Sequence, residues 1–158
     1  MANGKYDCQA TIDGLSNNTP YIFKLSIVSV DRSESKLSPE KSVTPTDQIA
    51  PATPTRLEIS VVDNSILKFT WNSNSNDAAK HRVYRGTASG QYGESFDSQL
   101  GAFSLSLPLD RINGENNYFT ITAIDSSGNE SGQHPEVSCT GVGSAINCGG
   151  GGEPPINN

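Results

Sequence analysis

Apolar and polar residues alternate in short runs along most of this chain, and this period of two constrains the fold more than any other feature. In the run 65–71 (SILKFTW), Leu67, Phe69 and Trp71 fall on one side of an extended strand. We find no window with apolar residues sustained at the i, i+3, i+4 and i+7 spacing of an amphipathic helix. The pattern therefore predicts an all-β protein built from short strands.

Five further runs have the same character, at 55–62, 81–85, 104–109, 117–125 and 135–140. Turns rich in Asn, Gly, Ser and Asp separate them, as in NSNSND and DSSGNESG. Evenly spaced strands with such turns predict an antiparallel sandwich whose core is formed by the inward side chains. We expect that core to contain Leu57, Ile59, Phe69, Trp71, Val83, Leu107, Phe119 and Ile121.

An internal repeat indicates two units. The run IDGLSNNTPYIFKLSIVSVD at 12–31 has the plan of LDRINGENNYFTITAID at 109–125, and Tyr21 matches Tyr118 at an offset of 97 residues. A repeat of this length fits one β-sandwich per unit. More than fifty strand-like residues precede the second copy, whereas eleven residues precede the first.

Residues 51–140 resemble a bacterial, extracellular fibronectin type III domain. The resemblance rests on four segments in order: the proline-rich entry APATPTRLEIS, then LKFTW, HRVYRGTASGQYG and YFTITAIDSSGNES. Residues 8–46 resemble the second half of the same fold, with strand E in CQATI, a corner in DGLSNNTPY, strand F in YIFKLSIVSVD and strand G in SPEKSVTPTD. The resemblance implies an immunoglobulin-like antiparallel β-sandwich preceded by a partial second sandwich.

We accordingly expect four segments: a partial unit with strands E, F and G only at 1–47, a linker at 48–54, a complete domain at 55–140, and a Gly-rich C-terminal tail at 141–158. The first residues, MANGKYD, contain no apolar stretch of the kind found in signal peptides. Met1 is therefore either a natural start or the edge of an excerpt.

The family places a Tyr at the start of strand F, and its hydroxyl bonds back to the preceding corner. Tyr21 fits that role. In the second unit, the parity set by Phe119 and Ile121 turns Asn117 inward instead of Tyr118. Either Asn117 replaces the tyrosine, or the expected register is wrong by one residue.

In the first unit Tyr21, Phe23, Leu25 and Ile27 form an apolar face without strands A, B or C to cover it. Burying such side chains stabilises a fold by about 1.5–3 kcal/mol each, and exposed together they favour aggregation. Upstream sequence of a longer protein could supply the cover, or a second subunit or neighbouring copy could supply it by β-augmentation. Alternatively, residues 1–47 pack on the second domain in a way foreign to the family. The first two alternatives make protein the expected partner.

Cys139 and Cys148 flank the flexible segment TGVGSAIN, and we expect a disulfide between them. Closing such a loop is worth about 2–3 kcal/mol and implies an oxidising compartment; the alternative is two unrelated thiols. Cys8 aligns with Leu105 at the same offset of 97, which predicts a buried, unpaired thiol.

Nothing in the sequence points to catalysis, a metal or a cofactor. His81 and His134 are isolated, and the chain has no HExxH, CxxC, G-x-S-x-G or P-loop spacing. The carboxylates are scattered over turns, so the chain is not predicted to be an enzyme. Asn17 and Asn129 match the glycosylation sequon, which is a weak signal in a chain rich in Asn, Ser and Thr.

Charge and hydropathy exclude two classes of partner. A net charge of −6 spread along the chain argues against nucleic acid. No run approaches the roughly 18 apolar residues that span a bilayer, so we expect no membrane insertion by this chain.

The resemblance implies a non-catalytic extracellular or cell-surface module: a spacer, adhesion or accessory domain of a secreted or surface bacterial protein. Because such modules often lie beside polysaccharide-degrading enzymes, it also implies polysaccharide as a second class of partner. The alternative is a structural subunit of an extracellular filament or surface appendage, in which a partner chain or neighbouring subunit completes the N-terminal sandwich.

Overall fold

The computed structural model describes residues 8–112, 116–141 and 145–149. The chain divides into unit 1, Met1–Asp47, and unit 2, Gln48–Asn158, which are described separately. Within the described residues every strand pairing is antiparallel and no α-helix occurs, although short 3-10 turns such as η1 (Leu109–Arg111) are present. The predicted all-β fold is therefore confirmed.

Unit 2 consists of two sheets. Its strands are β3 (Thr55–Val62), β4 (Ile66–Asn72), β5 (Ala78–Gly86), β6 (Glu94–Asp97), β7 (Ser104–Pro108), β8 (Asn116–Asp125), β9 (Val137–Thr140) and β10 (Asn147–Gly149).

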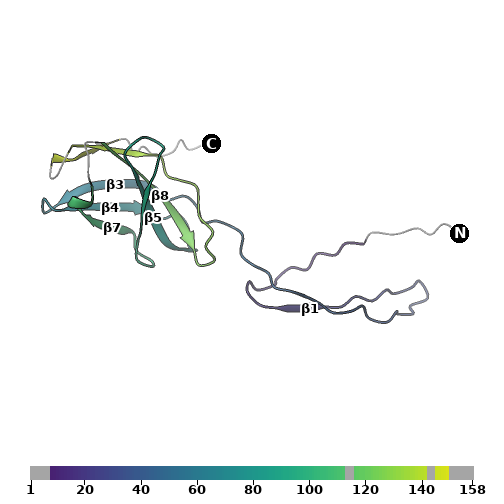
Figure 1. Cartoon of the computed structure of the whole chain (residues 1–158). Coiled ribbons are helices and arrows are strands. Elements are labelled where there is room, and N and C mark those ends of the chain that lie inside the picture. The colour runs from purple at the N-terminus through teal and green to yellow at the C-terminus, as the bar shows by residue number, and fades with distance from the viewer. Residues whose placement is uncertain (1–7, 113–115, 142–144, 150–158) are drawn as a thin grey trace. The chain divides into compact units, whose positions relative to one another are not determined.

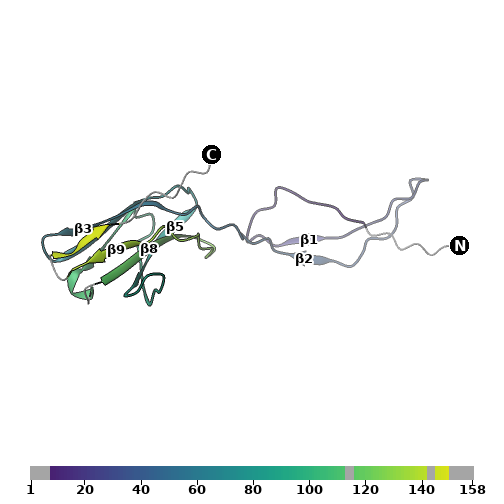
Figure 2. The ribbon, with the colours of Figure 1, turned by 90° about the horizontal axis from the view of Figure 1, so that it is seen from above.

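One sheet has the order β3-β4-β7 and the other β10-β9-β8-β5-β6. Figure 1 shows β3, β4 and β7 side by side, and Figure 2 shows β9 beside β8 in the second layer. The first, second and fifth strands thus share one sheet, while the third, fourth, sixth and seventh share the other, which β10 extends as an eighth strand. This division of the first seven strands is that of an immunoglobulin-like sandwich, so the predicted fold class is confirmed.

The hairpin between β3 and β4 shows how local sequence sets the register. Asp63 and Asn64 are the central residues of the turn closed by the Ser65 N–H to Val62 carbonyl hydrogen bond, and their φ values are 49° and 52°. Two positive values at these positions match the twist of antiparallel strands. The resulting register places Ile59 opposite Phe69 and Val61 opposite Leu67. Apolar side chains of both strands therefore lie on the same face.

The core lies between the two sheets of unit 2. Seven of the eight predicted core residues are buried there, and Phe69 contacts Phe119 edge to face with ring centroids 5.1 Å apart. The eighth, Ile59, is only partly buried against this cluster. Leu57, two residues earlier on the same strand, is buried, so the partial exposure begins at Ile59.

Unit 1 is a hairpin rather than a set of three long strands. Its two strands, β1 (Tyr21–Phe23) and β2 (Lys41–Val43), pair with each other, and an isolated bridge joins Val28 and Glu34. Residues 8–12 form no strand, so the expected strand E is wrong.

The expected strand F, 21–31, is also shorter than predicted because serine side chains replace part of the backbone ladder. The Leu25 N–H donates to Ser38 Oγ (3.0 Å) and the Ile27 N–H to Ser35 Oγ (2.9 Å). Serine hydroxyls compete with regular strand pairing in this way.

Two predicted boundaries need correction. Pro51 and Pro54 are buried, so the second half of the expected 48–54 linker is part of the sandwich. Within the expected tail at 141–158, β10 pairs with β9 and extends the larger sheet. Residues 150–158 of that tail lie outside the described residues.

Candidate functional site

Exposed apolar side chains are concentrated in unit 1. Of eleven large hydrophobic residues that are exposed in the described part of the chain, eight precede residue 48. They are Ile12, Ile22, Leu25, Ile27, Val28, Val30, Leu37 and Val43. Exposed apolar side chains concentrated on one small unit are typical of a site of interaction.

The hairpin itself buries only part of the apolar face that a partner is expected to cover. Tyr21 and Phe23 are partly buried, with stacked rings 6.4 Å apart. Leu25 and Ile27 remain 73% and 75% exposed. The hairpin therefore covers two of the four predicted side chains in part and leaves the other two in solvent.

Tyr21 also makes the corner contact expected of it. The Ser16 N–H donates to the Tyr21 hydroxyl oxygen at 2.9 Å, which ties the segment before the strand to its first residue. Cys8, in contrast, is exposed. The predicted burial of Cys8 is wrong because residues 8–12 do not form the inward-facing strand on which that prediction depended.

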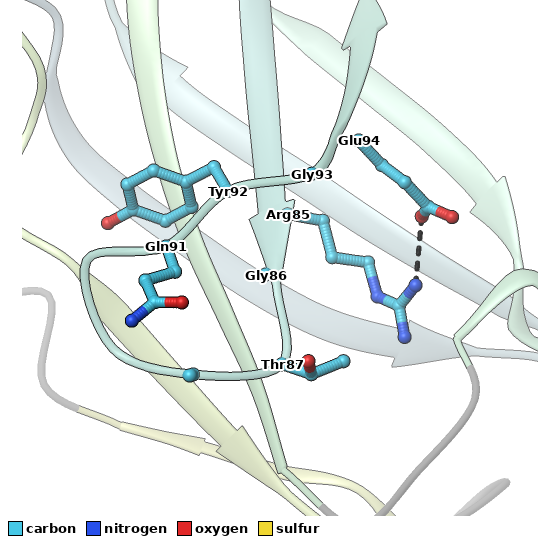
Figure 3. Close-up of a pocket in the computed structure, with 8 residues that line it drawn as sticks. Arg85, Gly86, Thr87, Gln91, Tyr92, Gly93 and Glu94 are labelled. Carbon is cyan, nitrogen blue, oxygen red and sulfur yellow. Dashed lines mark hydrogen bonds and ion pairs between the residues drawn. The ribbon is translucent and has the colours of Figure 1, made fainter.

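A hollow of about 430 Å³ lies at the turn between β5 and β6, lined by residues 85–88 and 91–94. Arg85 contributes a guanidinium whose side chain is 7% exposed, and its Nη1 contacts Glu94 Oε2 at 2.8 Å. Figure 3 shows these two side chains pointing toward one another beside the turn. The Arg85 Nε also donates to Asn117 Oδ1 at 2.8 Å.

This contact shows which way Asn117 points, and so decides between the two registers considered for its strand. The amide is fully buried and faces inward, as the parity of Phe119 and Ile121 predicts. Its oxygen accepts from Arg85 on the neighbouring strand β5. The expected register is therefore correct.

Glu136, the residue before β9, forms hydrogen bonds with the turn between β5 and β6. Its carboxylate accepts hydrogen bonds from Ser89 Oγ (2.7 Å), the Gly90 N–H (2.8 Å) and the Tyr92 hydroxyl (2.7 Å). Burial raises the pKa of Glu136, but the three hydrogen bonds outweigh it and hold the pKa below its usual value. Burial and the contact with Glu136 raise the pKa of Tyr92 to about 12.

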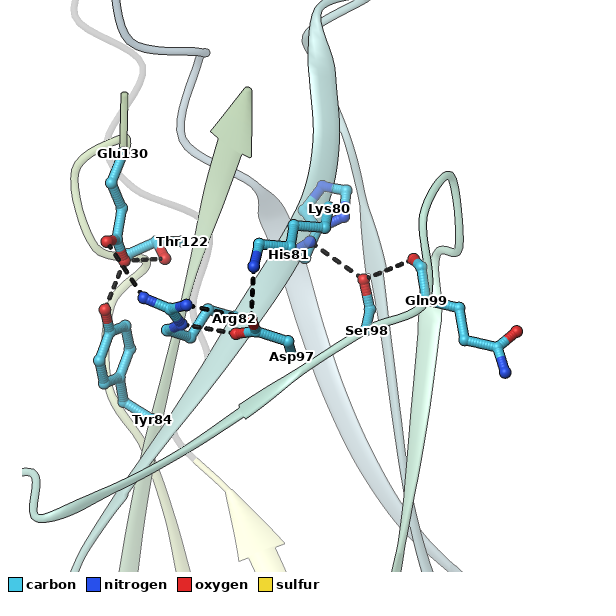
Figure 4. Close-up of polar contacts among 9 residues, drawn as sticks. All are labelled: Lys80, His81, Arg82, Tyr84, Asp97, Ser98, Gln99, Thr122 and Glu130. Carbon is cyan, nitrogen blue, oxygen red and sulfur yellow. Dashed lines mark hydrogen bonds and ion pairs between the residues drawn. The ribbon is translucent and has the colours of Figure 1, made fainter. Parts of the chain in front are cut away.

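A polar network covers the outer face of β5. Asp97 contacts the Arg82 Nε and the Lys80 Nζ, each at 2.5 Å. The Arg82 hydrogen bond, opposed by burial and helped by Lys80, lowers the pKa of Asp97 to about 2. Glu130 accepts from the Tyr84 hydroxyl and from Thr122 Oγ1 (2.6 Å), as Figure 4 shows. These charges are paired with one another, so the face shows no strong field of one sign.

Both histidines are buried, in different ways. His134 accepts from the Leu57 N–H at 3.4 Å and lies 2.6 Å from the Pro135 carbonyl oxygen. His81 lies between the rings of Trp71 and Phe103, and neither ring nitrogen makes a hydrogen bond of ordinary geometry to the described residues. Burial lowers the pKa of His81, against a smaller opposing effect of the Ala102 backbone.

The predicted disulfide and the two predicted glycosylation sequons complete the set of sites. A disulfide joins Cys139 to Cys148, which face each other across β9 and β10. Asn17 is exposed in a turn, whereas the Asn129 amide nitrogen donates to Asp125 Oδ2 at 2.8 Å. Of the two sequons, only the one at Asn17 therefore offers an acceptor amide that faces solvent.

Among the described residues, no group of three or more His, Cys, Asp or Glu side chains could hold a metal ion. Within the same ranges, no helix has the length and hydropathy needed to cross a membrane.

The hollow and the Glu136 contacts were not predicted from the sequence. The inward parity of Asn117 pointed to the first, because a buried amide requires a partner. No sequence signal indicates that Glu136 meets a turn more than forty residues earlier in the chain.

Comparison with known proteins gives matches only among solved structures; no family model and no curated protein matches the chain. The FN1–FN3 domains of chicken CNTN1 align at 12% identity and a TM-score of 0.49 over 78% of this chain. This chain spans 42% of the length of that structure. Domains d3–d4 of the rat CD45 extracellular region align at 12% identity and a TM-score of 0.44, covering 94% of this chain and 71% of that one. An FN3 domain of human collagen XX aligns at 19% identity and a TM-score of 0.42, covering 58% and 94% of the two chains.

Proposed function

We propose that this chain is a non-catalytic structural and interaction module of an extracellular or cell-surface protein. Unit 2 is its folded spacer, and the exposed face of unit 1 is its interaction site. The proposal rests on one observation: eight large apolar side chains are exposed in unit 1, whose two strands have three residues each, whereas unit 2 has a closed core.

The cover for unit 1 is a polypeptide that adds strands. A two-stranded hairpin is marginally stable in water, because three or more strands with an apolar face are needed for independent stability. Both edges of the β1–β2 sheet also carry backbone groups that require hydrogen bonds. A small ligand could cover Leu25 and Ile27 but could not pair those edges.

The extracellular assignment is supported by the disulfide between Cys139 and Cys148, since such bonds persist in oxidising compartments. A spacer or adhesion role suits a sandwich whose charged side chains are neutralised among themselves, as Asp97 is by Arg82 and Lys80.

Sedimentation velocity of the whole chain over a range of concentrations tests the proposal. The double substitution Leu25→Asp with Ile27→Asp places charges on the exposed face of unit 1. The matched control is Leu100→Asp, which changes a side chain that is 80% exposed on unit 2. Self-association that the double variant loses and the control keeps would mean that a neighbouring copy supplies the cover.

A monomer that binds an added strand through unit 1, and loses binding only in the double variant, would mean that another polypeptide supplies it. A monomer in which both substitutions leave every property of unit 1 unchanged would refute the proposal.

A further inference from the structure

We propose that the loop between β6 and β7, residues 98–103, is a latch that opens in mildly acidic solution, and that His81 is the residue that senses the proton. The loop and His81 both lie in unit 2, so the latch does not depend on how unit 1 is covered. Its opening gives the spacer domain a surface that changes with pH.

Backbone hydrogen bonds attach the loop to the first half of β5. The Ser98 N–H donates to the His81 carbonyl oxygen at 2.8 Å, and the Gly101 N–H donates to the Ala79 carbonyl oxygen at 2.9 Å. In return, the His81 N–H donates to Ser98 Oγ at 3.0 Å, as Figure 4 shows. Because residues 98–103 form no strand, the loop can leave β5 while the pairing of β5 with β8 stays intact.

The closed loop separates the His81 ring from water. The ring lies between those of Trp71 and Phe103, at centroid distances of 5.1 and 6.1 Å, and His81 is 2% exposed. Phe103, the last residue of the loop, is 58% exposed and so covers the imidazole on the solvent side. Neither imidazole nitrogen makes a hydrogen bond of ordinary geometry to the described residues, and the same holds for Trp71 Nε1. Water can bind these three atoms once the loop moves, which favours the open form.

A proton on His81 in the closed form has no anion beside it. The loop, SQLGAF, contains no charged residue, and β7 contains none either. On β5, Lys80 and Arg82 alternate to the outer face of the sheet, where Asp97 of β6 pairs with both. Protonation therefore places an uncompensated charge in a buried site.

The charged groups on the other elements around His81 are also engaged or exposed. On β8, Asp125 accepts three hydrogen bonds from the turn that follows it. On β6, Glu94 pairs with Arg85 near the end of β5. Lys68 on β4 is an exposed cation, and Asp77, in the turn before β5, is exposed to solvent.

The direction of the pH response follows from this environment. Burial lowers the pKa of His81, against a smaller opposing effect of the Ala102 backbone. In the open form the imidazole is hydrated, and its pKa returns to about 6.5. Proton binding then multiplies the population of the open form by about 1.1 at pH 7.5 and by up to about 11 at pH 5.5. The closed form is therefore stable above pH 6.5 and loses up to about tenfold in population ratio as the pH falls to 5.5.

Hydrogen exchange of the whole chain at pH 7.5 and pH 5.5 tests the latch, with each rate divided by that of an unfolded peptide at the same pH. The amides of Ser98 and Gly101 report on the loop, and that of Val83, in the middle of β5, reports on the sandwich. We expect the loop amides to be much less protected than Val83 at both pH values, and their protection to fall up to about tenfold on acidification. The variant His81→Phe keeps an aromatic ring but binds no proton, so its loop protection should not change with pH.

Three results would overturn the proposal. Loop amides as strongly protected as Val83 would mean that the loop opens only when the whole domain unfolds. Loop protection that is the same at both pH values, or a fall that His81→Phe retains, would mean that His81 is not the sensor. If His81→Phe does not fold, an NMR titration of the His81 ring in the unmodified protein decides the point: the latch requires a pKa below about 6.5, and a value at or above it refutes the latch.

Discussion

Replacing a phenylalanine with alanine should lower the stability of the sandwich strongly in unit 2 and hardly at all in unit 1. Phe69 is fully buried and contacts Phe119 edge to face at 5.1 Å. Phe23 is only partly buried, on the hairpin of unit 1. Phe69→Ala removes buried surface and leaves a cavity, whereas Phe23→Ala removes a side chain that belongs to no closed core.

The magnitudes follow from these positions. Loss of a fully buried phenylalanine costs about 3–5 kcal/mol, which includes the roughly 0.5–1.5 kcal/mol contributed by an edge-to-face ring pair. For a domain of the size of unit 2, each kcal/mol lowers the melting temperature by about 4–8 °C. Phe69→Ala should therefore lower it by at least about 12 °C. A surface change such as Phe23→Ala should alter the stability of the sandwich by less than about 0.5 kcal/mol.

The fluorescence of Trp71 provides the assay. It is the only tryptophan of the chain and is 4% exposed in the core of unit 2, so its thermal transition follows the sandwich alone. If Phe69→Ala did not lower the melting temperature seen by Trp71 fluorescence, the core would be wrongly assigned. An equal shift in Phe23→Ala would show that the two units share one cooperative core, which would refute the division proposed for them.

Three further changes test the sandwich. Replacing Cys139 and Cys148 with alanine should lower the free energy of unfolding in urea by about 2–3 kcal/mol, because the disulfide closes a short loop with a sequence separation of 9; an unchanged midpoint would contradict this. Because burial lowers the pKa of His81, the unfolded chain binds a proton more readily, and stability should fall as the pH drops below about 6.5. His81→Phe should reduce that dependence between pH 7 and 5, and an identical pH profile would argue against a buried neutral imidazole. Gly86→Ala should destabilise the fold by about 1–3 kcal/mol through its clash with the Gln91 carbonyl, whereas Gly93→Ala, whose Cβ meets nothing within 4 Å, should be neutral.

Local alternation was enough to predict the sandwich. The inward positions of Phe69 on β4 and Phe119 on β8 follow from a period of two once a strand is assigned, and both are fully buried. Partial burial of Ile59 was not predictable, because alternation gives Leu57 and Ile59 the same inward face of β3. How fully each is covered depends on packing against distant segments.

Unit 1 departed from its predicted strands because alternation takes no account of competing side chains. Ser35 and Ser38 bond to the N–H groups of Ile27 and Leu25, and a hydrophobicity pattern does not register such contacts. The candidate site was only partly visible for a related reason. The parity of Asn117 indicated a buried amide in need of a partner, but the identity of that partner, Arg85, depends on the pairing of β5 with β8.

Hydrogen exchange on the whole chain at low concentration tests the central claim most directly, which is that unit 1 lacks a cover of its own. The comparison is between the amides of residues 23–30 and those of residues 119–124, in a sample proven to be monomeric. The second set lies in the buried strand β8 and should be strongly protected, whereas the first lies in a hairpin with exposed Leu25 and Ile27 and should exchange almost as fast as an unfolded chain. Equal protection of the two sets in the monomer would contradict the account, because unit 1 would then be stable without any added strand.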